Sequence, residues 1–229
     1  MSLAGVAIVL ALGCVQALSA EAQPEQSLDR AGLLARWRED FELDQLDRIL
    51  AEGPALVSGG GPLAHDGEAL ALVARALFAA GREGTAQSLL ATARPLDEAG
   101  CVAIELARAE IALARDELET VLAIVYDATT RSVRRARSPD AWWLAAQAFA
   151  RAGARDEAEP LLVHLLELAP HSVIVPSACH MLAHNALARG DRERAQRFRE
   201  QGEHAARWQA VFRARRIQLR AHPADPLPR

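Results

Sequence analysis

The chain has 229 residues, of which 51% are hydrophobic and 24% are charged, and this balance indicates a folded body rather than an intrinsically disordered one. Aromatic residues make up only 4% and alanine is abundant, which favours closely packed helices over β-sheets. The net charge is −4 and all 26 basic residues are arginine, so chemistry that needs a Schiff-base lysine or a P-loop lysine is excluded.

The first 22 residues have the features of a targeting segment. Residues 1–20 carry no charge, and Ala20-Glu21-Ala22 forms an A-x-A cleavage pattern, so this segment resembles a secretory signal peptide. The stretch Ala11-Leu12-Gly13-Cys14 also resembles a bacterial lipobox, with Cys14 as the lipidation candidate. An uncleaved membrane anchor or an ordinary first helix stays open as an alternative. We expect a periplasmic or envelope-associated protein, with a membrane-anchored or cytoplasmic protein as the alternatives.

Residues 23–65 are expected to hold an N-terminal helical segment and a glycine-rich linker. Apolar residues recur at helical spacing from Leu33 to Leu50, which predicts one bent helix or a helical pair that ends near Gly53. The glycine-rich segment Ser58–Pro62 marks the linker. It does not have the sequence of a phosphate-binding loop, because no Lys-Ser or Lys-Thr follows the glycines.

Residues 66–204 contain a repeat that is clearest between Asp140 and His171. Its large, small, aromatic and turn positions are Trp142, Ala145, Ala146, Phe149, Gly153, Ala158, Leu162 and Pro170. This pattern resembles the tetratricopeptide repeat. The candidate turn residues of successive units stand 35, 37 and 37 residues apart, at Gly81, Asp116, Gly153 and Gly190. The resemblance implies an all-α, right-handed α-solenoid of about four antiparallel helix hairpins, which bury their apolar faces by stacking.

Residues 205–229 are expected to form a basic capping helix and a proline-rich tail. The spacing of Phe198, Ala205, Trp208 and Phe212 predicts that the last helix runs on and covers the open end of the stack. Residues 1–130 hold 9 arginines against 20 acidic residues, whereas residues 189–229 hold 11 arginines against 5. An acidic body with a basic end is a clue to the partners of the protein.

The resemblance implies that the first helices of the repeats line a concave face that binds peptides. The candidate partner-binding residues lie one step off the packing stripe: Trp143, Gln147, Arg151, His180, His184, Glu110, Arg75 and Phe78. Such a surface suits an extended peptide with an aromatic or acidic group. In the alternative, Trp143 packs on a neighbouring repeat and the polar residues are only solvated. The expected function is a non-enzymatic scaffold or adaptor of the bacterial envelope.

Two other functions stay open. The C-terminal arginines could bind anionic lipid or nucleic acid, through Arg207, Arg213, Arg215, Arg216 and Arg220. His180 and His184 share one helical face and could hold a metal, but the sequence assures no third ligand.

The remaining expectations concern cofactors, partners and cysteines. We expect no catalytic site, no cofactor, no metal and no small-molecule substrate. A protein or peptide partner is preferred to nucleic acid, with membrane association through the N-terminus as a further expectation. Cys101 and Cys179 fall two repeats apart, which is too far for a disulfide.

Overall fold

The computed structural model describes residues 29–126 and 138–221, so the predicted leader with Cys14 and the proline-rich tail lie outside the described residues. The described residues are helical and contain no strand, which confirms the all-α class. No helix among them is both long enough and apolar enough to cross a membrane. The helices in these residues are α1 (Arg30–Glu42), α2 (Asp47–Val57), α3 (Gly67–Ala79), α4 (Glu83–Thr92), α5 (Glu98–Ala114), α6 (Leu118–Tyr126), α7 (Pro139–Arg151), α8 (Arg155–Leu168), α9 (Val175–Ala188) and α10 (Arg192–Ala221).

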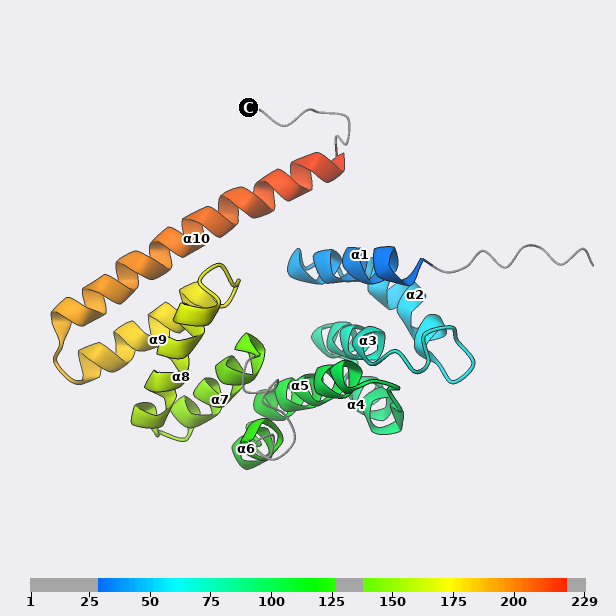
Figure 1. The fold of residues 1–229 in the computed structure, drawn as a ribbon, viewed down its shortest axis with the longest axis horizontal. Coiled ribbons are helices and arrows are strands. Elements are labelled where there is room, and N and C mark those ends of the chain that lie inside the picture. Colours follow the sequence, from blue (N-terminus) through cyan, green and yellow to red (C-terminus); the bar gives the residue numbers. More distant parts are fainter. Residues whose placement is uncertain (1–28, 127–137, 222–229) are drawn as a thin grey trace, which may run out of the picture.

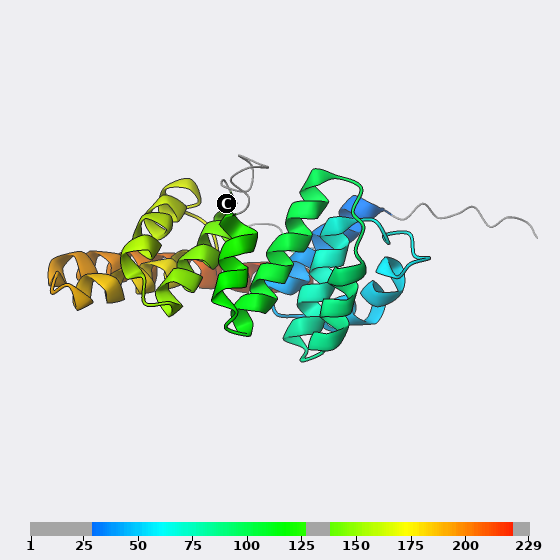
Figure 2. The ribbon, with the colours of Figure 1, turned by 90° about the horizontal axis from the view of Figure 1, so that it is seen from below.

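The helices follow one another along a curved row (Figure 1). The odd-numbered helices α1, α3, α5 and α7 lie on the inner side of the curve, and α2, α4, α6 and α8 lie on its outer side. Seen from below, α3 to α7 stand side by side, while α10 runs across them (Figure 2). Each helix packs on the next one along the chain, and α1 also packs on α3, α3 on α5 and α5 on α7. The described residues therefore form a repeat-like helical fold.

Five turns of one backbone geometry join the helices in pairs. The residue after the C-cap of each first helix has a positive φ, and these residues stand 37, 35, 37 and 37 positions apart: Asp44, Gly81, Asp116, Gly153 and Gly190. The amide that follows donates to a carbonyl five residues back, as Ala154 N does to Phe149 O at 2.8 Å. This Schellman arrangement satisfies carbonyls that the end of a helix would leave without a partner. The turn at Asp44 makes α1 and α2 a fifth pair, outside the range where the sequence pattern placed the repeat.

Two positions are buried in all five pairs. Seven residues before the turn residue, none is more than 2% exposed: Trp37, Ala74, Ala109, Ala146 and Ala183. Five residues after the turn residue, none is more than 1% exposed: Ile49, Ala86, Val121, Ala158 and Ala195. Four of the five pairs have alanine at the first of these positions, and a side chain of that size lets two helices approach closely. The buried positions recur with the turns, so the packing repeats as well as the backbone.

In the first pair, α1 and α2, the large and the small residue stand at exchanged positions compared with other pairs. Trp37 takes the place of alanine on α1, and Gly53 stands on α2 at the position that Leu90 and Leu162 fill in other pairs. A Cβ at Gly53 would lie 2.6 Å from Val73 Cγ2 and 3.6 Å from the Trp37 ring. The Val73 side chain of α3 therefore occupies the space that a larger residue at Gly53 would need, and the indole lies beside it at van der Waals distance. Because α2 continues through Gly53 to Val57, the predicted helix end near Gly53 is wrong.

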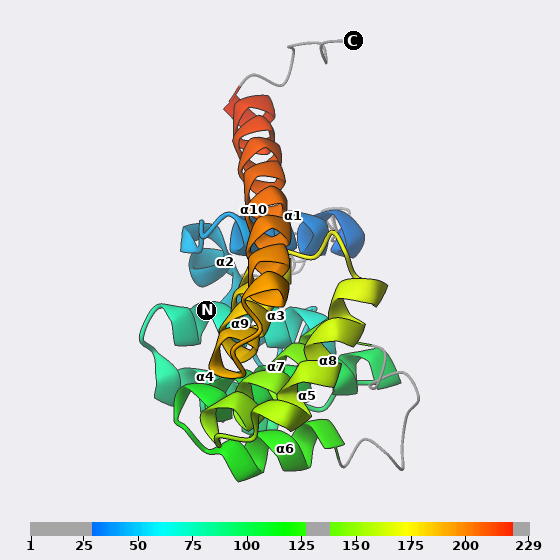
Figure 3. The same ribbon diagram turned by 90° about the vertical axis from the view of Figure 1, so that its left-hand side faces the viewer.

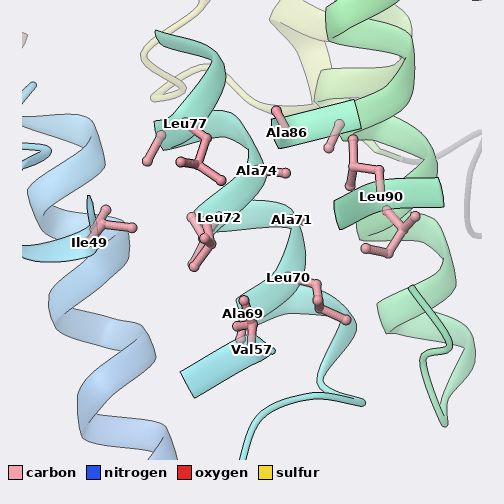
Figure 4. Close-up of a cluster of buried hydrophobic side chains, with 14 of the residues drawn as sticks. Ile49, Val57, Ala69, Leu70, Ala71, Leu72, Ala74, Leu77, Ala86 and Leu90 are labelled. Atoms are coloured by element: carbon pink, nitrogen blue, oxygen red, sulfur yellow. The ribbon is translucent and has the colours of Figure 1, made fainter. Parts of the chain in front are cut away.

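The buried core extends along the whole row. One cluster joins α1 to α5, a second joins α5 to α7, and a third joins α7 to α10. In the first cluster, the side chains of α3 lie between Ile49 of α2 and Leu90 of α4 (Figure 4). Two glycines let α3 and α5 touch, because a Cβ at Gly67 would lie only 2.3 Å from the Cα atom of Gly100. Neighbouring pairs are thus held by direct packing.

α10 is one continuous helix of 30 residues. Its first half packs on α9, and Phe198 and Ala205 contact the third cluster. Its second half projects past the other helices (Figure 3), where Trp208 is 49% and Phe212 46% exposed. The expectation that these four residues cover the end of the stack is correct for Phe198 and Ala205. Trp208 is only half covered, on the side where its ring meets His171 of the loop before α9, with centroids 5.9 Å apart.

Candidate partner-binding surface

α9 exposes one stripe of side chains. His180, His184 and Leu187 recur at intervals of three or four residues and are exposed, whereas Cys179 and Leu182 on the same helix are buried. The buried residues of α9 pack against α8 and α10. The two imidazoles therefore lie one turn apart on the face of α9 that these neighbours leave uncovered.

α7 carries three further candidates at the same spacing. Trp143 is partly buried and packs against the cluster that joins α7, α8 and α9, and Gln147 is also partly buried. Arg151 is exposed at the end of α7, where its guanidinium donates to the carbonyl oxygen of Leu113 at 2.5 Å and lies 3.7 Å from Asp116 Oδ1. Trp143 thus combines both alternatives raised by the sequence, because it packs on its neighbours and still keeps accessible surface.

Arg75 of α3 and Glu110 of α5 meet in an ion pair, with Arg75 Nη2 and Glu110 Oε1 2.7 Å apart. Burial raises the pKa of Glu110 above its ordinary value, the charge of Arg75 opposes this effect, and the nearby Asp140 adds to it. Both charges are already engaged with each other, so these two candidates hold α3 and α5 together.

Phe78 follows Arg75 by one turn on α3. Its ring is partly buried and packs against the first cluster, which joins α1 to α5. The predicted residues therefore fall into two groups by helix: those on α7 and α9, and those on α3 and α5, where Phe78 stands one turn after the ion-paired Arg75. The first group is the best candidate for contact with a partner, because it includes the most exposed side chains.

Arginines also link successive pairs in a way that the sequence analysis missed. Arg115 stands directly before a turn residue, and its Nε atom lies 3.6 Å from Glu83 Oε1 of the preceding pair. Arg189 stands at the equivalent place in the last pair and forms ion pairs with Asp156 and Glu159 of the pair before it. An arginine just before two of the five turns, with a carboxylate early in the previous second helix, was the signal available in the sequence.

Four cavities of about 270 to 480 Å³ in the described part of the chain lie beside other residues. One of about 270 Å³ lies between α10 and the loop before α9, where His171, Val175 and Trp208 line it. Another of about 320 Å³ lies among α4, α5 and α6, beside Arg108. The candidates on α7 and α9 line none of these cavities, and the exposed ones among them present an open surface. Such a surface offers contact along its length and does not enclose a small molecule.

Metal-binding and thiol chemistry find little support among the described side chains. Within residues 29–126 and 138–221, no group of three or more His, Cys, Asp or Glu residues could hold a metal ion. His164 instead packs on Trp142, with ring centroids 4.4 Å apart. Cys101 and Cys179 are free thiols. Burial raises the pKa of Cys179 to about 11, so this thiol stays protonated at neutral pH and is a poor nucleophile.

Comparison of the chain with protein-family models, with curated proteins and with solved structures found no match. The inference of function depends on the geometry of the chain itself.

Proposed function

We propose that the chain is a tetratricopeptide-like, right-handed α-solenoid of antiparallel hairpins that binds an extended peptide of a partner protein on its inner face. In this proposal it is a non-enzymatic scaffold or adaptor of the bacterial envelope. The observation that carries the proposal is the exposed stripe of α9, with His180 and His184 one turn apart. The envelope location depends on the resemblance of the first 22 residues to a signal peptide.

The repeated turn and its two buried positions support the solenoid. One hairpin of two short helices cannot bury its apolar face alone, so successive hairpins must stack. The three core clusters, which together extend from α1 to α10, agree with such stacking. The handedness is proposed from the family resemblance.

The side chains of α7 and α9 offer chemistry that suits a peptide. An imidazole can both donate and accept hydrogen bonds, and an extended peptide has free backbone groups of both kinds. Trp143 would supply a flat apolar contact, and tryptophan is common among residues that dominate binding energy. The ion pair of Arg151 with Asp116 is exposed and long at 3.7 Å, so it is weak enough to yield to an acidic group of the peptide.

Selection from a displayed library of random peptides, followed by measurement of Kd for the selected peptides, tests this function. We expect peptides rich in acidic or aromatic residues. A double substitution His180→Gln, His184→Gln should weaken their binding roughly tenfold or more, the range of residues that dominate an interface. Both histidines are exposed, so the fold should tolerate the change.

The matched control is His65→Gln, which changes an exposed histidine on the loop before α3. It should leave peptide binding unaltered. Trp143→Phe is a second variant that keeps the packed ring and should reduce affinity without loss of helicity. Peptides that bind the double variant as tightly as the natural chain would show that the inner face of α7 and α9 is not the site.

A further inference from the structure

The second half of α10 presents an apolar surface outside the core. Val211 is 72% exposed, and Trp208 and Phe212 on either side of it are about half exposed. The rings of Trp208 and Phe212 stack on each other, with centroids 5.2 Å apart and planes 10° apart. Three large apolar side chains within two helical turns form more exposed apolar surface than isolated surface residues do.

The contacts of α10 show which side of this segment faces the protein. Gln209 donates to the carbonyl of Ser172 at 2.8 Å, and Arg213 donates to the carbonyl of Glu42 at 3.0 Å. These two residues are one turn apart and so share a face that points at the body. Val211 stands on nearly the opposite side of the helix, which explains its high exposure. The apolar surface therefore consists of Val211 and the exposed sides of Trp208 and Phe212, whereas the covered side of Trp208 meets His171, with ring centroids 5.9 Å apart.

The charge of the same segment is wholly positive. From His204 to Ala221 the sequence has five arginines and no acidic residue. Arg207 is exposed and stands four residues, about one helical turn, before Val211, so it lies near Val211 on the outward side. Apolar and aromatic residues beside arginines are the composition of helices that lie in the interface of an anionic bilayer.

Two other occupants fit these observations less well. A second copy of the same segment would bring arginines against arginines, and like charges across an interface are unfavourable. Single-stranded nucleic acid would need open ring faces for base stacking, but Trp208 and Phe212 each cover one face of the other. The aliphatic side chain of Val211, the most exposed of the three, has no partner on a nucleic acid.

We propose that the second half of α10 docks on an anionic bilayer surface, with Trp208, Val211 and Phe212 among the lipid headgroups and Arg207 beside lipid phosphates. This surface goes beyond the peptide-binding function proposed for α7 and α9. It would place the chain on a membrane without a membrane-spanning helix in the described residues.

Co-sedimentation of the full chain with vesicles tests this proposal. We expect binding to vesicles that contain phosphatidylglycerol, much weaker binding to phosphatidylcholine alone, and a decrease as salt rises. The double substitution Trp208→Gln, Val211→Gln keeps the net charge and should weaken partition about tenfold, since it removes the apolar contribution. Arg207→Gln should weaken binding to anionic vesicles roughly fivefold.

Leu96→Gln is the matched control, because Leu96 is 84% exposed on the loop before α5. It should bind as the natural chain does. The leader is the same in every variant, so differences between variants report α10 alone. Val211→Gln is a milder variant that keeps the aromatic stack, in case the double variant unfolds. Equal vesicle binding by the Val211 variant and the natural chain would overturn the proposal. The proposal would also be overturned if the natural chain formed a dimer, or bound a single-stranded RNA oligonucleotide, and the same substitutions abolished that association.

Discussion

Two glycines within helices have opposite surroundings. A Cβ at Gly202 of α10 would lie 2.9 Å from Cys179 Cβ and 3.4 Å from the carbonyl oxygen of Pro176, both on α9. A Cβ at Gly84 of α4 would meet nothing within 4 Å. Gly202 therefore sets how closely α9 and α10 approach, whereas Gly84 has no packing reason to lack a side chain.

We predict that Gly202→Ala destabilises the protein and that Gly84→Ala stabilises it. Overpacking at Gly202 should cost about 1–3 kcal/mol, which outweighs the gain of up to about 1 kcal/mol that alanine brings to a helix. Only that gain, about 0.5–1 kcal/mol, applies at Gly84. Urea denaturation of both variants measures the two effects. Equal changes of the same sign would contradict the packing assigned to Gly202.

The repeat was visible in the sequence where its residues have the usual sizes, and hidden where they do not. Ala146 and Ala158 signalled the pair α7 and α8. In the first pair, Trp37 is large where the other pairs have alanine, and Gly53 is small because Val73 of α3 fills the space beside it, so the pattern of residue types disappears although Trp37 is as buried as those alanines. Asp44 takes the positive φ that glycine takes elsewhere, which aspartate tolerates better than most residues. A pattern of residue types cannot reveal such compensation, because it depends on which side chains meet.

At the scale of an element, α10 has two halves in different surroundings. Ala195, Phe198 and Gly202 pack on α9 or its neighbours, and the half beyond Ala205 touches the body through few groups. The helical period of the sequence continues across both halves, so it predicted one helix correctly. It could not show where the contacts of that helix stop, because periodicity describes the helix and not its neighbours.

Hydrogen exchange should distinguish the two halves of α10. We expect amides from Ala195 to Ala206 to be protected by global packing. Amides beyond Trp208 should exchange at least about tenfold faster, because they open by local fraying. Site-resolved exchange by mass spectrometry measures this difference. Uniform protection along α10 would mean that its second half is covered in solution, and the exposed face would then not be free to dock.

At the scale of the whole molecule, two carboxyl groups that connect neighbouring pairs of helices respond to pH in opposite directions. Burial alone would raise the pKa of Asp66, but a hydrogen bond from Arg30 and the amides of Ala69 and Glu68 lower it below its ordinary value. The pKa of Glu110 is raised, first by burial. Asp66 connects α1 to α3, and Glu110 connects α3 to α5.

We predict that stability differences for two variants change with pH in opposite directions. The stabilisation from Asp66 is present above its unfolded pKa and is lost as pH falls through the lower folded value, so Asp66→Asn should differ least from the natural chain in acid. Folded Glu110 holds a proton that the unfolded chain has lost in the window between its ordinary and raised pKa. The stability of the natural chain relative to Glu110→Gln should therefore rise as pH falls through that window. Urea denaturation at several pH values measures both.

The candidate site was only partly visible from sequence, for a related reason. Spacing correctly put His180 and His184 on one exposed face of a helix. It also selected Arg75 and Glu110 as separate surface groups, whereas they neutralise each other across two helices. Which charges face which neighbours depends on how the pairs stack, and that information is distributed over the whole chain.

α10 also connects the two ends of the curved row of helices. A curved row of helices with only local contacts can change its curvature, because each pair of helices can rotate slightly against the next. α10 starts at one end of the row, and its part up to Arg213, about 33 Å long at 1.5 Å per residue, reaches the carbonyl of Glu42 at the other end. This hydrogen bond therefore joins the two ends of the row directly, across the length of one helix. One residue added to or removed from that helix would turn Arg213 by about 100° and release the two ends from each other.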